Sequence, residues 1–318
     1  MLKNKNFSLL YIFFVSLSLA LFPWDSVYKS IFVDRYTYYI LITHYENRIH
    51  YVDFDSVLSY ITEEWFWSFL TFLWHDYLKF DINYFFLIIS FLLVYTSLLV
   101  LRLHGVLYLS IFFVNPIFIE FFYSQLRLAL AMSIIFMAYY LFKTKGANFI
   151  GFFLLLLSLF IHTTSIIFIL LIFSFIFIKK DISRFIFSIL IPVFLSLMTG
   201  TYRYSFLSYI GDRRAEYSDM SGDWYILILY YIILFTMIIT WVIKVRAKSF
   251  PEWYYISLSS LSLCFFSYVF HSYPSRFLVA LYPFVLMGVV LLPKHLKILA
   301  ILGNIFYILF AFVFWTGI

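Results

Sequence analysis

Eleven long apolar segments follow one another along this chain of 318 residues, and the ionisable residues between them are unevenly distributed. Hydrophobic residues make up 64% of the sequence and charged residues only 12%, which excludes a soluble globular domain. A helix needs about 20 apolar residues to cross a bilayer. We therefore predict transmembrane spans at 7–23, 83–101, 105–122, 126–142, 147–162, 163–178, 182–199, 225–243, 254–270, 277–292 and 296–315.

This pattern predicts an all-α polytopic membrane protein with about 11 transmembrane helices, within a range of 10 to 12. A transmembrane β-barrel would alternate polar and apolar residues, whereas the run at 85–101 shows no alternation. Short loops and the absence of linker segments predict that residues 1–318 form a single transmembrane helical domain.

Charge asymmetry gives the expected orientation. Lys3 and Lys5 precede the first span, which lacks a small-residue cleavage site and is expected to be a retained helix with a cytoplasmic N-terminus. With this orientation the inner loops carry thirteen Lys and Arg residues against two acids, and the outer side carries nine bases and fourteen acids. This bias follows the positive-inside rule and places the C-terminus outside.

Two long segments are expected on the outer face, at 24–82 and 200–224. Residues 60–80 are apolar enough to enter a membrane, but a full crossing there would place Lys143, Lys145, Lys179 and Lys180 outside. We therefore predict an interfacial or re-entrant helix near 60–80. Because the inner loops are short, we expect a bulky substrate to bind and react at the outer face.

Several function classes are excluded by missing features. The lone Cys264 lies within a span and allows neither an intrachain disulfide nor a cysteine metal site. Asp53 and Asp55 resemble a metal-binding pair, but such pairs are common in acidic loops, so no metal and no cofactor are expected. The basic residues are spread over the inner loops, where they determine the orientation in the membrane and form no basic patch. Nucleic acid is therefore excluded as a partner.

Three ionisable residues stand where apolar segments meet the predicted outer boundary: Arg127, His162 and Arg276. A buried arginine requires an anion, a carboxylate such as Glu120, or an escape to water. A helix N-terminus together with a guanidinium can bind phosphate. His162 is suited to proton transfer, or to a simple hydrogen bond with a neighbouring helix.

Six short motifs are spread over most of the chain: DRYTY at 34–38, EEWF at 63–66, RLALA at 127–131, a charged turn near 143–148, SLFIHTTS at 158–165 and RF at 276–277. In these motifs and in their order the chain resembles the EpsG-like branch of Wzy polysaccharide polymerases. One departure is that Leu128 follows the central arginine, where the family commonly has glutamine, and Gln125 precedes it.

The resemblance implies a GT-C-like glycosyltransferase that joins undecaprenyl-diphosphate-linked oligosaccharide repeat units into O-antigen, capsular or exopolysaccharide. Both donor and acceptor are lipid-linked sugars in the bilayer, and the active site faces outward from the bacterial cytoplasmic membrane. The sequence leaves open the sugars, the anomeric outcome, the oligomeric state and whether a Wzz-like chain-length regulator binds.

Residue roles follow from this chemistry. A departing diphosphate can be stabilised by arginines without a metal ion, and an acceptor hydroxyl needs a base. The expected diphosphate-binding residues are Arg127, Arg276, Arg213 and Arg214. The expected catalytic base is His162, with Glu64 and Asp34 as rivals. The expected sugar-binding residues are Tyr38, Trp65, Tyr202 and Trp224, although an aromatic belt at the membrane surface accounts for many such residues.

Other functions stay open at this stage. A transporter or flippase of lipid-linked sugars would need polar residues near mid-membrane, which spans such as 83–101 lack. A sugar O-acyltransferase would need cytosolic access to an acyl donor. An O-antigen ligase shares the donor and chemistry, and the long acidic first outer loop favours a polymerase over it.

Overall fold

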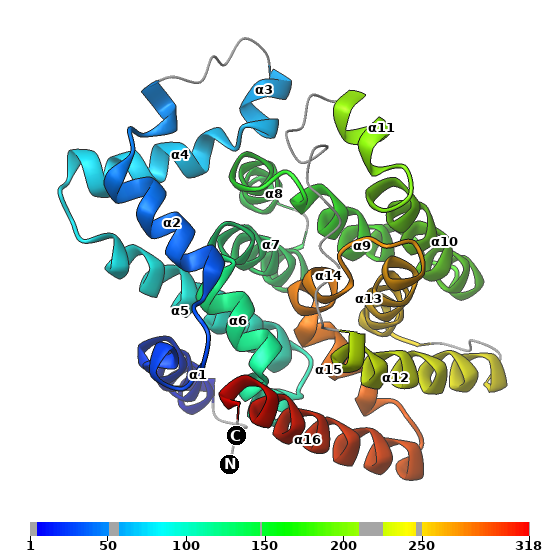
Figure 1. Ribbon diagram of the computed structural model, residues 1–318. Coiled ribbons are helices and arrows are strands. Elements are labelled where there is room, and N and C mark those ends of the chain that lie inside the picture. Colours follow the sequence, from blue (N-terminus) through cyan, green and yellow to red (C-terminus); the bar gives the residue numbers. More distant parts are fainter. Residues whose placement is uncertain (1–4, 51–56, 147, 210–224, 246–249, 318) are drawn as a thin grey trace. The chain divides into compact units, whose positions relative to one another are not determined.

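Helices account for every regular element in the computed structural model, which describes residues 5–50, 57–146, 148–209, 225–245 and 250–317 (Figure 1). This confirms the all-α prediction for the described part of the chain. The contacts divide the chain into two compact units. Unit 1 comprises Met1–Ile166 with Val313–Ile318, and unit 2 comprises Ile167–Phe312.

Unit 1 contains eight α-helices and four short 3-10 or π-helical turns among the described residues. They are α1 (Lys5–Leu21), η1 (Trp24–Ser26), α2 (Val33–His44), η2 (Arg48–His50), α3 (Val57–Thr62), α4 (Trp65–Thr71), η3 (Phe72–Tyr77), α5 (Ile82–Leu103), η4 (Leu107–Val114), α6 (Pro116–Ser124), α7 (Leu126–Lys145) and α8 (Phe149–Ile161).

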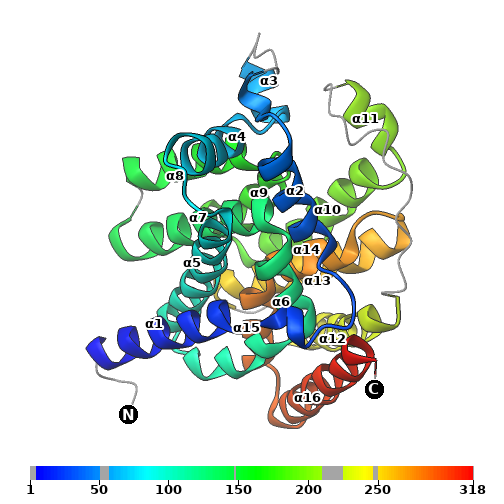
Figure 2. The same ribbon diagram turned by 60° about the vertical axis from the view of Figure 1, so that its left-hand side comes forward.

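Helices α5 and α7 form the centre of unit 1. They lie side by side, with α1 against α5 and α8 against α7 (Figures 1 and 2). Asp81 caps the start of α5 by accepting a hydrogen bond from the backbone N–H of Asn83 at 2.9 Å, which satisfies one of the unpaired first-turn donors. Ser90 of α5 donates to the carbonyl of Phe122 at 2.8 Å and ties α6 to the same core.

The predicted span at 105–122 is broken. Its two helices, η4 and α6, meet at a bend of 84°. Asn115 is the cause, because its side chain accepts from the backbone N–H of Ile117 at 3.1 Å and starts a new helix, while Pro116 occupies the first helical position. Proline has no N–H to continue the preceding helix, so the chain turns there.

Unit 2 is organised around α13. Its helices are α9 (Ser165–Phe177), α10 (Asp181–Thr199), α11 (Arg203–Tyr209), α12 (Tyr225–Lys244), α13 (Glu252–Val269), α14 (Pro274–Ala280), α15 (Tyr282–Val290) and α16 (Lys294–Thr316), whose last turn belongs to unit 1. Helix α13 packs against α10, α12, α14 and α15. A Cβ at Gly288 would lie 2.0 Å from the Ser257 hydroxyl, so α13 and α15 approach closely only because residue 288 is glycine.

Four described helices are long and apolar enough to cross a membrane: α5, α7, α10 and α16. The number rises to six if each bent pair, η4 with α6 and α14 with α15 (77°), counts as one span. Each of the eleven predicted segments coincides with one or two helices, but α8 and α9 have 13 residues each. Such helices are about 20 Å long, shorter than a hydrocarbon core of about 30 Å.

The segment predicted as one interfacial or re-entrant helix, 60–80, consists of three short pieces: α3, α4 and the π-helix η3. Glu64 separates α3 from α4 by adopting a left-handed conformation (φ 56°). The pieces α3 and α4 both pack against α8. The hydroxyl of Thr163, in the α8–α9 turn, also donates to the carbonyl of Ile61 in α3.

Candidate functional site

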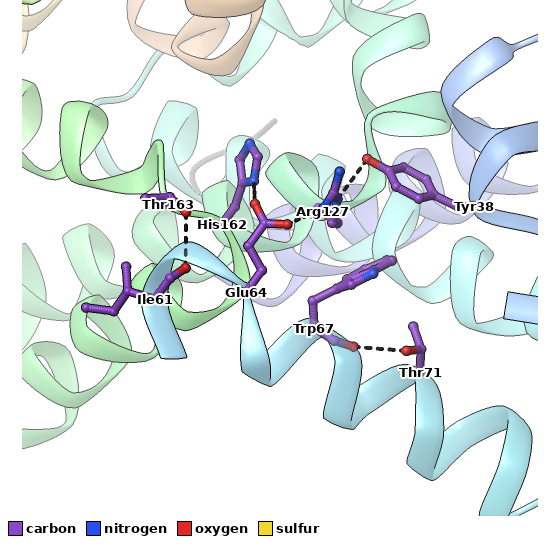
Figure 3. A network of polar contacts seen from close by, with 8 residues as sticks. All are labelled: Tyr38, Ile61, Glu64, Trp67, Thr71, Arg127, His162 and Thr163. Atoms are coloured by element: carbon purple, nitrogen blue, oxygen red, sulfur yellow. Dashed lines mark hydrogen bonds and ion pairs between the residues drawn. The ribbon is translucent and has the colours of Figure 1, made fainter. Parts of the chain in front are cut away.

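A polar network in unit 1 joins four of the residues singled out in the sequence: Tyr38, Glu64, Arg127 and His162 (Figure 3). They come from α2, the α3–α4 junction, the first turn of α7 and the C-terminal end of α8. Since these segments are far apart in sequence, only the folded helices bring the four side chains together.

Glu64 is the centre of the network and is 2% exposed. Its left-handed backbone costs about 1–2 kcal/mol for a residue other than glycine. The carbonyl of Glu64 accepts from the N–H of Ser68 at 3.3 Å, so the residue also starts α4. Strained conformations of this kind persist where surrounding contacts fix them, and they concentrate at functional sites.

Both carboxylate oxygens of Glu64 are engaged. Nη1 of Arg127 donates to Oε2, and Nδ1 of His162 contacts Oε1 (Figure 3). A buried carboxylate requires compensation of this kind, because removal from water penalises the charged form. The arginine that the sequence expected to need an anionic partner is therefore paired with Glu64.

The geometry defines the protonation pattern of His162. An ionised carboxylate only accepts hydrogen bonds, so the proton on the neutral imidazole lies on Nδ1 and the lone pair on Nε2. Figure 3 shows the second ring nitrogen directed away from Glu64. A carboxylate in this position holds the imidazole in one tautomer and one orientation.

A second link holds the histidine in place. His162 ends α8, and its backbone N–H donates to the carbonyl of Ser158 at 3.1 Å. The adjacent Thr163 donates from its hydroxyl to the carbonyl of Ile61 at 3.1 Å, which ties the α8–α9 turn to the end of α3 (Figure 3). These two hydrogen bonds hold the turn that carries His162 against the end of α3, close to Glu64.

Arg127 reaches a second partner, Tyr38 of α2. Its Nε donates to the phenolic oxygen at 3.0 Å, and its guanidinium carbon lies 5.0 Å from the ring centroid. The Tyr38 ring lies 5.6 Å from that of Trp67. Burial raises the pKa of Tyr38, Arg127 opposes the rise and Asp34 adds to it, so Tyr38 is a neutral hydrogen-bond partner at neutral pH.

The Arg127 and His162 side chains are partly accessible, at 19% and 15%, whereas that of Glu64 is 3% exposed. A ligand can therefore reach the guanidinium and the imidazole while the carboxylate behind them stays shielded. This arrangement suits an anion at Arg127 and proton transfer at His162.

Two further predicted residues lie close to the network. Asp34 is in the first turn of α2, one helical turn before Tyr38, and acts on it electrostatically. Trp65 follows Glu64 directly and stacks on Phe69, with ring centroids 5.5 Å apart and planes at 15°. The half-buried Trp65 ring therefore lies in an aromatic cluster next to the network.

The remaining predicted site residues belong to unit 2 or lie outside the described residues. Arg276 and Tyr202 belong to unit 2; the guanidinium of Arg276 lies 5.8 Å from the ring of Tyr273, and Tyr202 is 54% exposed. Three other predicted residues, Arg213, Arg214 and Trp224, lie outside the described residues. The same holds for Asp53 and Asp55.

Arg35 belongs to the DRYTY motif at 34–38, but the sequence did not suggest a role for it. Its guanidinium lies 4.1 Å from the ring of Tyr123 and 5.1 Å from that of Phe86, and its Nη1 donates to the Tyr123 carbonyl at 3.2 Å. Tyr123 in turn donates to Asp25 at 2.6 Å. Arg35 thus anchors α2, the helix that carries Tyr38, to the end of α6.

In the described part of the chain, no group of three or more His, Cys, Asp or Glu side chains is arranged to hold a metal ion. No protein-family model, no curated protein and no solved structure matches the chain.

Proposed function

We propose that the protein is a polyprenyl-diphosphate-dependent glycosyltransferase. It polymerises undecaprenyl-diphosphate-linked oligosaccharide repeat units at the outer face of the bacterial cytoplasmic membrane, with a cytoplasmic N-terminus, eleven spans and a GT-C-like fold. The observation that carries the proposal is the convergence of Arg127, Glu64 and His162, because an anion-binding cation and an oriented base are what this reaction requires.

In the proposed reaction the acceptor hydroxyl oxygen attacks the anomeric carbon of the donor. The new carbon–oxygen bond forms as the bond to the diphosphate breaks, and undecaprenyl diphosphate departs with the bonding electrons. His162 accepts the hydroxyl proton on Nε2, the nitrogen opposite its contact with Glu64. Arg127 stabilises the charge that develops on the diphosphate.

The geometry favours His162 over its two rivals as the base. Both carboxylate oxygens of Glu64 are already engaged by Arg127 and His162, and its side chain is only 3% exposed, so an acceptor hydroxyl would reach His162 first. Asp34 acts on Tyr38 from the first turn of α2. We therefore assign Glu64 as a positioning residue that orients both His162 and Arg127.

Substrate binding in the proposal combines aromatic side chains with the bilayer. Tyr38, Trp65, Tyr202 and Trp224 are the proposed sugar contacts, and Arg276, Arg213 and Arg214 are further proposed diphosphate contacts. The polyprenyl tails lie in the lipid beside helices such as α16, whose exposed residues are strongly apolar, for example Phe306 at 72%.

The experiment compares Arg127→Ala, His162→Ala and Arg276→Ala in the native host. The surface polysaccharide is analysed as a ladder on a gel, and the protein level is measured in membranes. Matched controls are His104→Ala, which removes another histidine that is hydrogen-bonded in unit 1, and Arg184→Ala, which removes an arginine with its own ion pair.

Reduction of the ladder to a single repeat unit in the three test variants, with protein present and both controls normal, is the expected result. An unchanged ladder would assign these residues to stability alone and contradict the proposal. Loss of even the single unit would indicate export of lipid-linked sugars, the transporter alternative.

A further inference from the structure

Two attachments join α2 to the junction between α6 and α7 in unit 1, and Arg35 makes the first of them. Its guanidinium carbon lies 4.1 Å from the ring centroid of Tyr123, and its Nη1 donates to the Tyr123 carbonyl at 3.2 Å. The backbone N–H of Arg35 donates to the hydroxyl of Ser124 at 3.3 Å. The second attachment is the hydrogen bond of 3.0 Å from Nε of Arg127 to the phenolic oxygen of Tyr38.

The two attachments are close together in both segments. Arg35 and Tyr38 are three positions apart in α2, so their side chains are neighbours on the surface of that helix. Tyr123 lies at the end of α6, and Arg127 follows it by four positions, in the first turn of α7. The two attachments therefore close a short loop of contacts. A displacement of α2 at Arg35 has to be taken up at the bond between Tyr38 and Arg127.

Arg35 is held by aromatic rings and by charge. Its guanidinium carbon lies 5.1 Å from the ring centroid of Phe86 in α5, in addition to its contact with Tyr123. The Tyr123 hydroxyl donates to Asp25 at 2.6 Å. Burial lowers the pKa of Arg35, and Tyr123 and Asp25 oppose this fall. A planar guanidinium can stack on a ring and donate at its edge at the same time, which a lysine ammonium cannot do.

We infer that Arg35 is a positioning residue for Arg127. It fixes the turn of α2 that presents the Tyr38 hydroxyl, and this hydroxyl fixes Nε of Arg127 while Nη1 donates to Glu64. Arg35 thus acts through Tyr38 and not by touching the substrate. Its role in sugar transfer rests on the proposed function, whereas its effect on the bond between Tyr38 and Arg127 does not.

The first measurement reports this bond without requiring any activity. The full-length protein is prepared with meta-fluorotyrosine incorporated at position 38, and fluorine NMR in neutral detergent records its resonance. Arg127→Ala supplies the reference position for a phenol that has lost this donor. Arg35→Gln should move the resonance toward that reference, and Arg35→Lys, which keeps the charge but not the planar fork, should move it less. Gel filtration and thermal unfolding show which variants are folded.

The matched control is Arg184→Gln. Arg184 also lies beside a tyrosine ring, 6.0 Å from the centroid of Tyr255, but it belongs to unit 2 and pairs with Asp181 at 3.8 Å. It should leave the resonance unchanged. The inference is overturned by a wild-type resonance in folded Arg35→Gln, or in Arg35→Lys if only that variant folds. An equal shift in Arg184→Gln would overturn it as well.

The second measurement is a double-mutant cycle on kcat for transfer between lipid-linked oligosaccharides. Arg35→Gln should lower kcat by about tenfold, within the range of coupling in one hydrogen-bonded network, and this loss should disappear in a Tyr38→Phe background. An undiminished loss in that background would mean that Arg35 does not act through Tyr38, and would contradict the inference. Absence of transfer by wild type together with the expected fluorine shift would refute the proposed function and leave the positioning of Arg127 by Arg35 standing.

Discussion

Replacing Glu64 with glutamine keeps the shape of the side chain but removes its charge, and the consequences follow from its two contacts. The glutamine carbonyl oxygen can still accept from Arg127, which places the amide NH₂ against Nδ1 of His162. Since an amide N–H must donate, the imidazole is forced into the tautomer with its proton on Nε2. The nitrogen assigned to receive the acceptor's proton is then blocked.

The expected loss of rate is large. An amide behind a catalytic histidine lowers turnover by about 10⁴-fold in the well-studied case of serine proteases, equivalent to about 5.5 kcal/mol at about 1.4 kcal/mol per factor of ten. Stability should also fall. Removing one partner of a buried ion pair costs about 3–5 kcal/mol, and we expect the lower end because Arg127 is 19% exposed.

The assay is transfer between two synthetic prenyl-diphosphate oligosaccharides by purified protein, with thermal unfolding measured in the same detergent. Glu64→Gln should lower kcat with little change in KM, because the residue contacts the base rather than the sugar. Glu64→Asp keeps the charge and should retain more activity than Glu64→Gln. Turnover in Glu64→Gln within about tenfold of wild type would refute the assignment of Glu64 as the residue that orients His162.

Three further substitutions test the surroundings of the network. Tyr38→Phe removes the hydrogen bond to Arg127 and should cost about 1 kcal/mol in thermal unfolding. Because burial raises the pKa of Tyr38, its contribution is present below its ordinary pKa and is lost as the pH rises toward the folded-state value, so wild type should lose stability at alkaline pH that Tyr38→Phe does not. Thr163→Val leaves the Ile61 carbonyl without this donor and should cost about 1–3 kcal/mol, with a larger effect on kcat than on KM; an unchanged unfolding temperature would show that the α8–α9 turn is held by other contacts. Asn115→Ala removes the cap of α6 and should destabilise the protein by about 1 kcal/mol without changing KM, whereas a change in KM would mean that the bend shapes the substrate site.

The helices were largely predictable because long apolar runs dominate the sequence. Their breaks were harder to place. The run at 105–122 is apolar throughout, yet Asn115 and Pro116 form a cap and a helix start that outweigh hydropathy locally. The short helices α8 and α9 show the same limit, since apolar composition does not determine where each helix ends.

The network could be predicted only in part. A charge that is buried beside an apolar helix needs a partner. For Arg127 the sequence suggested the carboxylate of Glu120, which is close in sequence. The structure pairs Arg127 with Glu64, which depends on the packing of α3 and α4 against α8. Pairing across 63 sequence positions is a property of tertiary structure and leaves no spacing pattern in a single sequence.

The most direct measurement of the central claim uses wild-type protein in liposomes that contain a polyprenyl-diphosphate-linked repeat unit. Our account predicts a product of two joined units with release of one free polyprenyl diphosphate per bond formed, and neither product with His162→Ala. Movement of the intact lipid-linked unit across the bilayer, with no bond formed by wild type, would contradict the account.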